Sequence, residues 1–363
     1  MSSSNELTIG FVRRGFSSGG GAENYLSRLA AGVRNAGHDA ALYTSGEWPA
    51  DVWNFGPVVR LNAGTAIEFA DQLAKTARQP GEVRLSLERV WGCDVYRAGD
   101  GVHRAWLERR SRRSGPLKKI GRILNRKHTA ALALDESLFG KRGALRVIAN
   151  SRMVKEEIIR FYNYPADRIE VVYNGVPLPP RQATEEDRQQ TRKSLGLHAD
   201  DFVLLFAGSG WERKGLRFAV EAVQRQEKRT KLLVAGRGES RTFASTPTQF
   251  LGIVGDMPSL YQAADAFVLP TLYDPFSNAC LEALAAGLPV ITTQSNGFSE
   301  IIESGRHGTV VDDASNVDAL NDAIQFWSEP ERRKQARIDN LALAAQFDIS
   351  RNVAETLRVV IAR

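Results

Sequence analysis

Short apolar runs alternate with segments of helical spacing along the first half of the chain. The run at 7–12 leads into a loop, after which apolar residues recur every three or four positions from 26 to 33 and predict a helix. Gly37 is a typical helix end, and the apolar residues 40–43 predict the next strand. This order of strand, loop, helix and strand indicates a βαβ unit.

The same order recurs in the second half of the chain. Residues 202–206 predict a strand, which is followed by a glycine-containing loop, a helix and a second strand at 232–234. Further continuous apolar runs lie at 266–269 and 289–292. Strands of this kind, alternating with helices, are typical of parallel sheets that are covered on both faces.

The two patterns predict an α/β protein with two doubly wound, Rossmann-like domains that face each other across a cleft. A proline-rich link at 177–180 places the boundary, giving an N-terminal domain of residues 1–176 and a C-terminal domain of residues 177–344. The last stretch, 345–363, is helical in pattern. Packing on the N-terminal domain is one of two placements that the sequence leaves open for it.

Length and composition narrow the class of protein. The chain has 363 residues, of which 43% are hydrophobic and 25% charged, as in soluble globular proteins of about two domains. No apolar run reaches the roughly 18 residues that a membrane-spanning helix needs, and the start shows no secretory signal pattern. Cys93 and Cys280 fit neither a disulfide framework nor a zinc site. We therefore expect a cytoplasmic protein.

The net charge of +6 is distributed unevenly. Residues 1–176 hold 27 Lys and Arg against 18 Asp and Glu, whereas residues 177–344 hold 18 against 22. Much of the excess lies in 104–127, where ten basic residues accompany one acid, Glu108. We call residues 104–127 the basic segment.

The second half of the basic segment predicts an amphipathic helix. Leu117, Ile120, Ile123 and Leu124 recur at helical spacing between the charges. Such a helix favours attachment to an anionic membrane surface or to a phosphorylated acceptor, with a solvated helix packed on the first domain as the alternative. Nucleic acid is not expected, because no recognised binding module appears. The candidate membrane or acceptor residues are Lys118, Lys119, Arg122, Arg126 and Lys127.

Three loops carry candidate chemistry, and each lies between a predicted strand and a predicted helix. The first, 17–23, contains Gly19, Gly20 and Gly21. Glycines let backbone N–H groups approach a ligand, and a helix N-terminus attracts negative charge, so the loop suits a phosphate or a sugar. It matches neither the dinucleotide fingerprint nor the P-loop, and an ordinary tight turn is the alternative.

The second loop, 208–215, contains the adjacent cations Arg213 and Lys214. A planar guanidinium and a compact ammonium group can together neutralise a diphosphate without a metal ion. At the predicted start of a helix, the two charges oppose the helix dipole unless an anion lies between them. A diphosphate site is the favoured interpretation, and a solvated turn is the alternative.

The third loop, 274–282, opens a predicted helix. Ser277 and Asn278 are typical N-cap residues, and Glu282 follows one turn later. A carboxylate in that position can accept hydrogen bonds from the vicinal diol of a ribose. An acid that caps the helix or pairs with a lysine is the alternative.

Taken together, these residues resemble a known family. Gly20-Gly21-Ala22-Glu23, Arg213-Lys214-Gly215, and Asp274 with Glu282 eight positions later are similar to the motifs of retaining nucleotide-sugar glycosyltransferases of family 4, which have the GT-B fold. Residues 148–151, 172–176 and 286–290 resemble the same family. Within it, residues 92–96 and 98–100 are most similar to bacterial enzymes that add a hexose to the heptose of the lipopolysaccharide core.

The resemblance implies a role for each motif. The glycine loop contacts the donor sugar and phosphate, the two cations hold the diphosphate, and the acid in the third loop holds the ribose. The donor-binding set implied in this way is Gly20, Gly21, Arg213, Lys214, Ser277, Asn278 and Glu282.

The implied catalytic residues are Asp100, His103 and Asp274. Asp274 stands where the family usually has Glu, and is one methylene shorter. Asp100 and His103 occupy the place of the acceptor-side motif, and the role there is open between them. No cofactor and no metal are expected, because no Asp-x-Asp signature lies in a suitable loop and the two cations can replace a divalent ion.

The leading hypothesis is a metal-independent retaining glycosyltransferase. It would move a hexose from a nucleotide sugar, UDP-glucose or a similar UDP-hexose, to an anionic glycolipid or glycan acceptor of the lipopolysaccharide core, at the inner face of the cytoplasmic membrane. Two alternatives remain: a UDP-sugar epimerase with the GT-B fold, and a non-enzymatic two-domain sugar-binding protein.

Overall fold

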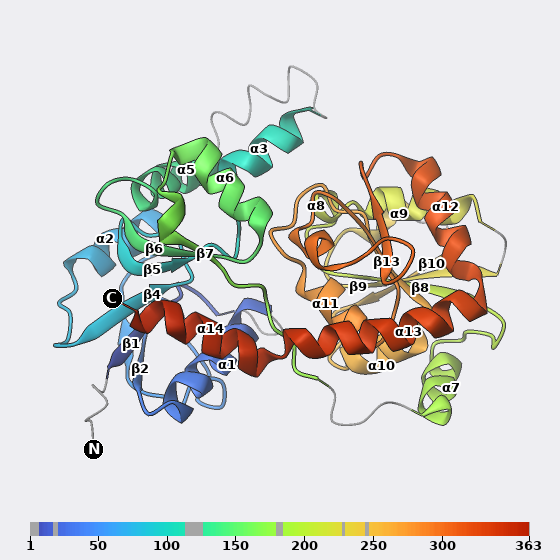
Figure 1. The fold of residues 1–363 in the computed structure, drawn as a ribbon, viewed down its shortest axis with the longest axis horizontal. Helices are drawn as coiled ribbons and strands as arrows, with labels where there is room; N and C mark the ends of the chain where they lie inside the picture. Colours follow the sequence, from blue (N-terminus) through green and yellow to red (C-terminus); the bar gives the residue numbers. More distant parts are fainter. Residues whose placement is uncertain are drawn as a thin grey trace. The chain divides into compact units, whose positions relative to one another are not determined.

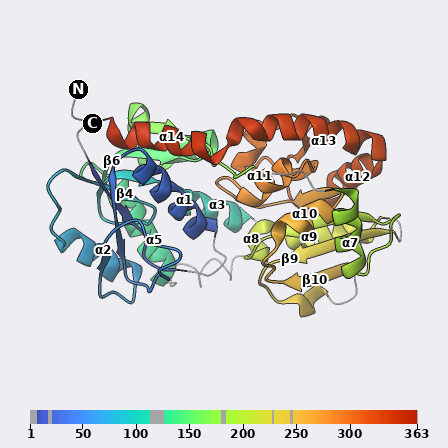
Figure 2. The ribbon, with the colours of Figure 1, turned by 90° about the horizontal axis from the view of Figure 1, so that it is seen from below.

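Figures 1 and 2 show the computed structural model of the protein. It describes residues 7–16, 21–112, 126–178, 184–226, 229–243 and 247–362. The chain divides into two compact units. Unit 1 is Met1–Asn174 with Ile349–Arg363, and unit 2 is Gly175–Asp348.

Unit 1 is built on a sheet of seven parallel strands in the order β3-β2-β1-β4-β5-β6-β7. The strands are β1 (Thr8–Val12), β2 (Asp39–Thr44), β3 (Val58–Arg60), β4 (Glu82–Ser86), β5 (Cys93–Arg97), β6 (Ala144–Ala149) and β7 (Ile169–Val171). The described helices are α1 (Gly21–Asn35), α2 (Ala66–Lys75), α3 (His103–Arg112), α5 (Arg126–Leu138), α6 (Arg152–Tyr162), the 3-10 turn η1 (Ala166–Arg168) and the C-terminal α14 (Ile349–Ile361).

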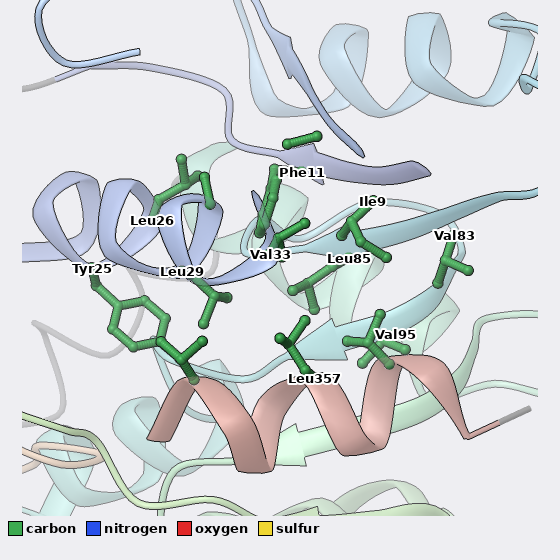
Figure 3. Packing of buried hydrophobic residues seen from close by; sticks show 14 of the residues in the cluster. Ile9, Phe11, Tyr25, Leu26, Leu29, Val33, Val83, Leu85, Val95 and Leu357 are labelled. Atoms are coloured by element: carbon green, nitrogen blue, oxygen red, sulfur yellow. The ribbon is translucent and has the colours of Figure 1, made fainter. Parts of the chain in front are cut away.

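The C-terminal helix α14 packs on unit 1, beside α1 (Figures 1 and 2). Leu357 of α14 belongs to the same buried cluster as Leu29 of α1 and Val95 of β5 (Figure 3). Gly32 of α1 makes this close approach possible, because a Cβ added there would lie 2.1 Å from Cγ1 of Val353. The structure thus places on unit 1 the helix whose position the sequence left open.

Unit 2 repeats the design with six parallel strands in the order β10-β9-β8-β11-β12-β13. The strands are β8 (Phe202–Ala207), β9 (Thr230–Ala235), β10 (Thr248–Gly252), β11 (Ala266–Leu269), β12 (Val290–Thr293) and β13 (Gly308–Val311). The helices are α7 (Glu185–Ser194), α8 (Trp211–Lys214), α9 (Leu216–Gln224), α10 (Met257–Ala263), α11 (Asn278–Ala285), α12 (Val317–Ser328) and α13 (Pro330–Ala344), with 3-10 turns η2 (Ser240–Phe243), η3 (Gly297–Ile301) and η4 (Ala345–Phe347). In this unit α12 packs against α9, α13 against α11 and α7 against α10.

Both sheets have the doubly wound strand order, so the predicted α/β class with two Rossmann-like domains is confirmed. In such sheets the order reverses beside the first strand, and ligands bind outside the carboxyl ends of the strands at that point. The reversal lies between β1 and β4 in unit 1 and between β8 and β11 in unit 2. The loops that follow these strands are therefore the expected positions of ligand-binding residues.

Candidate active site

The loop after β8 carries the two predicted diphosphate ligands, Arg213 and Lys214. They end the four-residue helix α8 and directly precede α9, whose N-cap is Gly215. Gly210 and Gly215 both adopt left-handed backbone conformations, with φ of 74° and 73°; Gly210 is the N-cap of α8, and Gly215 separates α8 from α9. Where the sequence pattern predicted a single helix start, the structure has one short helix followed by a second helix.

Lys214 forms an ion pair with Asp274, and the distance from Nζ to Oδ2 is 2.9 Å. The two side chains are only 14% and 8% exposed. Gly208, with φ of 137°, is required for this arrangement, because a Cβ there would lie 2.6 Å from Cδ of Lys214. The structure thus brings together two residues that the sequence analysis assigned to different parts of the donor.

Arg213 joins the loop after β8 to the loop after β11 through its backbone. Its carbonyl oxygen accepts hydrogen bonds from the Leu272 N–H at 2.8 Å and from Oγ1 of Thr271 at 2.9 Å. Within the described part of the chain, its half-buried guanidinium makes no hydrogen bond or ion pair. The backbone of Arg213 is fixed while its donors remain available to a ligand.

The N-terminus of α11 is held by two residues. Ser277 is the N-cap, as its residue type predicts, and its hydroxyl accepts from the Cys280 N–H; Asn278 is the first helical residue. Fully buried Asn296, which sequence reasoning missed, accepts from the N–H groups of Ser277 and Phe298. Its amide group also donates to Oγ1 of Thr292 and Sγ of Cys280. The Asn-Gly turn signal after β12 was the available hint, although it gives no indication of these partners.

Glu282 lies one turn into α11 and does not cap the helix, because Ser277 does. Its Oε2 accepts a hydrogen bond from the hydroxyl of Tyr261 in α10 at 2.9 Å. Burial, together with the negative charge of Glu282, raises the pKa of Tyr261 well above its ordinary value. The tyrosine therefore stays protonated and orients the carboxylate.

At the carboxyl edge of the unit 1 sheet, Gly20 lies outside the described residues and Gly21 begins α1. Arg13, directly after β1, donates to Glu23 of α1 at 3.0 Å and to Glu88 after β4 at 2.9 Å. Burial opposes the charge of Arg13, yet the two carboxylates raise its pKa above the ordinary value. Arg13 and Glu88 were not predicted as site residues.

Asp100 and His103 follow β5 and are connected through buried Asp135 of α5. Nε of Arg89 donates to Asp135 at 2.7 Å, and the backbone N–H of His103 donates to its other oxygen at 3.0 Å. Arg89 also lies 3.6 Å from Asp100, whose side chain is 63% exposed. Asp135 therefore fixes the position of His103, whereas Asp100 extends towards solvent.

His103 forms a pair with His128 of α5, in which Nε2 of His103 and Nδ1 of His128 are 2.9 Å apart. Burial, with Arg89 and His128 as further causes, lowers the pKa of His103 to about 4. The imidazole is thus neutral at physiological pH. Because His128 lies 25 positions along the chain, directly after the basic segment, no local spacing pointed to this pair.

The basic segment is described only in part. Lys118, Lys119 and Arg122 lie outside the described residues, while Arg126 and Lys127 are exposed in the first turn of α5. Closer to α3, Arg109 pairs with Glu157 at 2.6 Å, and Glu108 is itself paired with Arg160. Glu157 of α6 therefore balances one charge of an excess that looks uncompensated along the sequence, whereas Arg160 of α6 pairs with the segment's own acid.

Neither a metal-binding cluster nor a membrane-spanning helix is found among the described residues. No group of three or more His, Cys, Asp or Glu side chains there is arranged to hold a metal ion. No helix in the described ranges is both long enough and apolar enough to span a bilayer.

Two glycosyltransferase families match separate parts of the chain. The family described as Glycosyl transferases group 1 matches residues 201–329, and Glycosyltransferase Family 4 matches residues 98–178. The chain carries glycosyltransferase domains. The matched ranges include the residues described above from both sheets: Asp100 and His103 in one, and Arg213, Lys214, Asp274 and Glu282 in the other.

Individual relatives are also glycosyltransferases. An uncharacterized glycosyltransferase of Methanocaldococcus jannaschii is 33% identical over 180 residues, which are 45% of this chain and 46% of that protein. The lipopolysaccharide glucosyltransferase WaaG of Escherichia coli is 24% identical over 328 residues, covering 84% of this chain and 85% of WaaG.

Solved structures share the architecture of these glycosyltransferase domains. A crystal structure of WaaG covers 98% of this chain and all of its own, with a TM-score of 0.80 and 19% identity. HepE from Anabaena, crystallised with UDP-glucose, covers 97% of this chain and all of its own, with a TM-score of 0.75 and 21% identity. The fold is therefore of the GT-B type.

Proposed function

We propose that the protein transfers a hexose from UDP-glucose or a similar UDP-hexose to an acceptor of the lipopolysaccharide core or a related cell-envelope glycan, with retention of anomeric configuration and without a metal ion. The observation that carries the proposal is the arrangement at the carboxyl edge of unit 2. There Lys214 is paired with Asp274 while the donors of Arg213 remain available beside them. WaaG, a lipopolysaccharide glucosyltransferase, and HepE, crystallised with UDP-glucose, support the choice of donor and acceptor.

The donor half of the proposed reaction follows from charge. Cleavage of the sugar–phosphate bond places negative charge on the departing diphosphate, and preorganised cations lower the free energy of that state. Arg213 and Lys214 would supply these charges, and the N–H groups at the start of α11, near Ser277 and Asn278, add a favourable dipole. Glu282, oriented by Tyr261, would accept hydrogen bonds from the ribose hydroxyls.

Asp274 has a double role in this proposal. Its carboxylate neutralises Lys214 in the free protein, and it would contact the hexose when the donor binds. An ammonium group that already has a carboxylate partner keeps its position at low cost in entropy. The diphosphate would then meet a lysine that is already in place.

The acceptor half involves Asp100 and His103 on unit 1. Neutral His103 has one N–H donor and one acceptor nitrogen on its ring, and exposed Asp100 can accept a hydrogen bond from an acceptor hydroxyl. We propose that these two groups orient the acceptor, while the departing phosphate takes its proton. Gly20 and Gly21, at the start of α1, would contact the donor sugar and phosphate.

The decisive experiment is incubation of the protein with a panel of nucleotide sugars, with and without lipopolysaccharide-core acceptors. Release of UDP with formation of a glycosylated acceptor is the expected result, and the anomeric proton of the product reports retention. An epimerase would instead change the sugar without an acceptor, and a binding protein would leave every donor intact. Either of those results contradicts the proposal.

Metal independence has its own test. Activity should survive an excess of EDTA, because the two cations already neutralise the leaving group. A complete loss of activity in EDTA that is reversed by added magnesium or manganese would show that the reaction needs a metal ion.

Attachment to the cytoplasmic face of the membrane is proposed for the basic segment. The test variant replaces five residues by Gln and keeps the apolar positions: Lys118, Lys119, Arg122, Arg126 and Lys127. Each cation near an anionic bilayer contributes about 1 kcal/mol, so sedimentation with anionic vesicles should be lost in the variant and should weaken with salt in the wild type. Equal sedimentation of both proteins would contradict attachment through these charges.

A further inference from the structure

A cavity of about 460 Å³ lies on unit 2, among the start of α7, the end of α10, residues 287–289 and the start of α13. We call it the α13 cavity. It is next to the amino ends of β11 and β12, whereas the proposed donor residues follow the carboxyl ends of strands in the same sheet. Its volume is within the range of about 300 to 1,000 Å³ that is typical of small-molecule sites.

The charged side chains that line the α13 cavity are mostly cationic. Arg188, Arg333, Lys334 and Arg337 face two acids, Glu185 and Asp265. This excess is local, because residues 177–344 as a whole hold more acids than bases, 22 against 18.

One carboxylate is shared among several guanidinium groups. Asp265 receives Arg188 at 2.8 Å and Arg192 at 3.2 Å, and Nε of Arg333 lies 3.7 Å away. A single negative charge cannot neutralise three positive ones, so the group keeps a positive potential around the cavity.

Backbone carbonyl groups hold these guanidinium groups in place. Arg188 donates to the carbonyls of Gln262 and Ala264 at the end of α10, and Arg337 donates to that of Ala286 at the end of α11. Arg333 likewise donates through Nη1 to the carbonyls of Trp327 and Ser328 at the end of α12. The cations are thus preorganised before any ligand arrives.

The pKa shifts of two cavity arginines are consistent with a surplus of positive charge around the cavity. Burial, with nearby Arg188, lowers the pKa of Arg337, and Glu185 opposes the change. Burial likewise lowers the pKa of Arg333, with Arg188 and Arg192 adding to the effect and with Asp265 and Glu329 opposing it. The pKa of Arg13, which has two carboxylates, is instead raised. Both cavity arginines remain charged, and an anion would relieve the opposition to their charge.

We propose that the α13 cavity is a second anion-binding site, which takes a small phosphate-bearing ligand. Guanidinium groups are planar cations suited to phosphate oxygens, and exposed Lys334 adds a compact positive charge. Nothing in this assignment depends on the proposed glycosyl transfer, since the donor residues lie at the opposite edge of the sheet.

The first measurement is the melting temperature of the full chain in potassium phosphate and in potassium chloride of equal ionic strength. Phosphate at about 100 times its Kd should raise the melting temperature by about 5 to 10 °C. An unchanged melting temperature across the full range of phosphate concentrations would overturn the proposal.

The second measurement assigns the effect to the cavity. Lys334 is exposed, so Lys334→Glu can be made without disturbing the core, and it supplies the missing negative charge. In chloride it should melt at or above the wild-type temperature, and its affinity for phosphate should fall at least tenfold. Lys193→Glu makes the same charge change on exposed α7 outside the cavity and should keep the phosphate response.

A third variant separates this site from the proposed donor site. Arg213→Gln should retain the phosphate-dependent rise in melting temperature, because Arg213 does not line the cavity. Loss of the rise in Arg213→Gln, or an equal rise in Lys334→Glu and the wild type, would place the phosphate elsewhere and refute the α13 site.

Discussion

The carboxyl edges of the two sheets share one topology and differ in chemistry. In unit 2, a glycine loop presents Lys214, held by Asp274, and Arg213, whose donors have no described partner. In unit 1, Arg13 and Arg89 are each committed to buried acids, and His103 is neutral. The same strand order therefore positions a guanidinium without a described partner beside a paired lysine at one edge, and a largely neutralised network at the other. The fold determines where a ligand binds, while the side chains determine which ligand it is.

The largest expected effect comes from breaking the buried pair in unit 2. Lys214→Ala removes a charge-assisted contact to the diphosphate and also leaves Asp274, 8% exposed, without its cation. We expect a roughly hundredfold loss of kcat/KM and about 2 to 4 kcal/mol lower stability towards urea. Steady-state kinetics and urea titration measure the two effects separately.

A double variant provides the control for that prediction. Lys214→Met with Asp274→Asn removes both charges and should recover most of the stability while activity stays low. If Lys214→Ala unfolds at the wild-type urea concentration, the pair contributes little, and Asp274 is solvated in the free protein.

The second prediction concerns Arg213, the residue directly before Lys214. Arg213→Ala should reduce kcat/KM by roughly ten- to hundredfold, the cost of one charge-assisted contact of about 1.5 to 3 kcal/mol. Its melting temperature should remain that of the wild type, since the guanidinium has no partner among the described residues and its anchoring bonds are made by the backbone. A variant that melts earlier but turns over normally would show a structural role instead.

The elements were predictable from the sequence because they depend on local pattern. Ser277 capping α11 and the continuous apolar strands are examples, as both can be read within a few residues. The short helix α8 was not predicted, because it depends on the left-handed conformations of Gly210, which begins it, and of Gly215, which ends it after a single turn. Two glycines alone do not reveal in a sequence which of them will interrupt a helix.

The partners of site residues were not predictable in the same way. Tyr261 reaches Glu282 from another helix, 21 positions earlier in the chain, and His128 reaches His103 from 25 positions later. Such pairs exist only after the sheet has brought separate helices together. Local spacing therefore located the candidate residues, while tertiary packing determined how each is oriented and charged.

The third prediction tests whether Glu282 serves a ligand or only the fold. Glu282→Gln keeps the size and one acceptor but removes the charge, so UDP affinity should weaken by about tenfold with little change in melting temperature. Tyr261→Phe is the matched variant, since it removes only the hydroxyl that orients the carboxylate. Calorimetric titration with UDP should rank the wild type first, Tyr261→Phe second and Glu282→Gln last. Full affinity in Glu282→Gln, combined with a large fall in melting temperature, would assign the acid to stability.

The smallest expected effect concerns the histidine of unit 1 and its response to pH. The pKa of His103 is lowered to about 4 in the folded protein, chiefly by burial, against an ordinary value of 6.5. Between these two values the unfolded chain binds more protons than the native one, so stability falls as the pH drops from about 6.5 towards 4. His103→Gln lacks this titration and keeps a polar group of similar size.

Urea unfolding at pH 7.5 and pH 5 measures that difference. The free energy of unfolding of the wild type should fall by about 1 kcal/mol more than that of His103→Gln, after allowance for the partial exposure of the imidazole. Titrating groups away from the His103–His128 pair, such as His307, are present in both proteins and cancel in the comparison. Equal losses in the two proteins would mean that His103 is solvated and protonates freely. The proton-linked behaviour that distinguishes the edge of unit 1 from the fixed charges of unit 2 would then have to come from another residue.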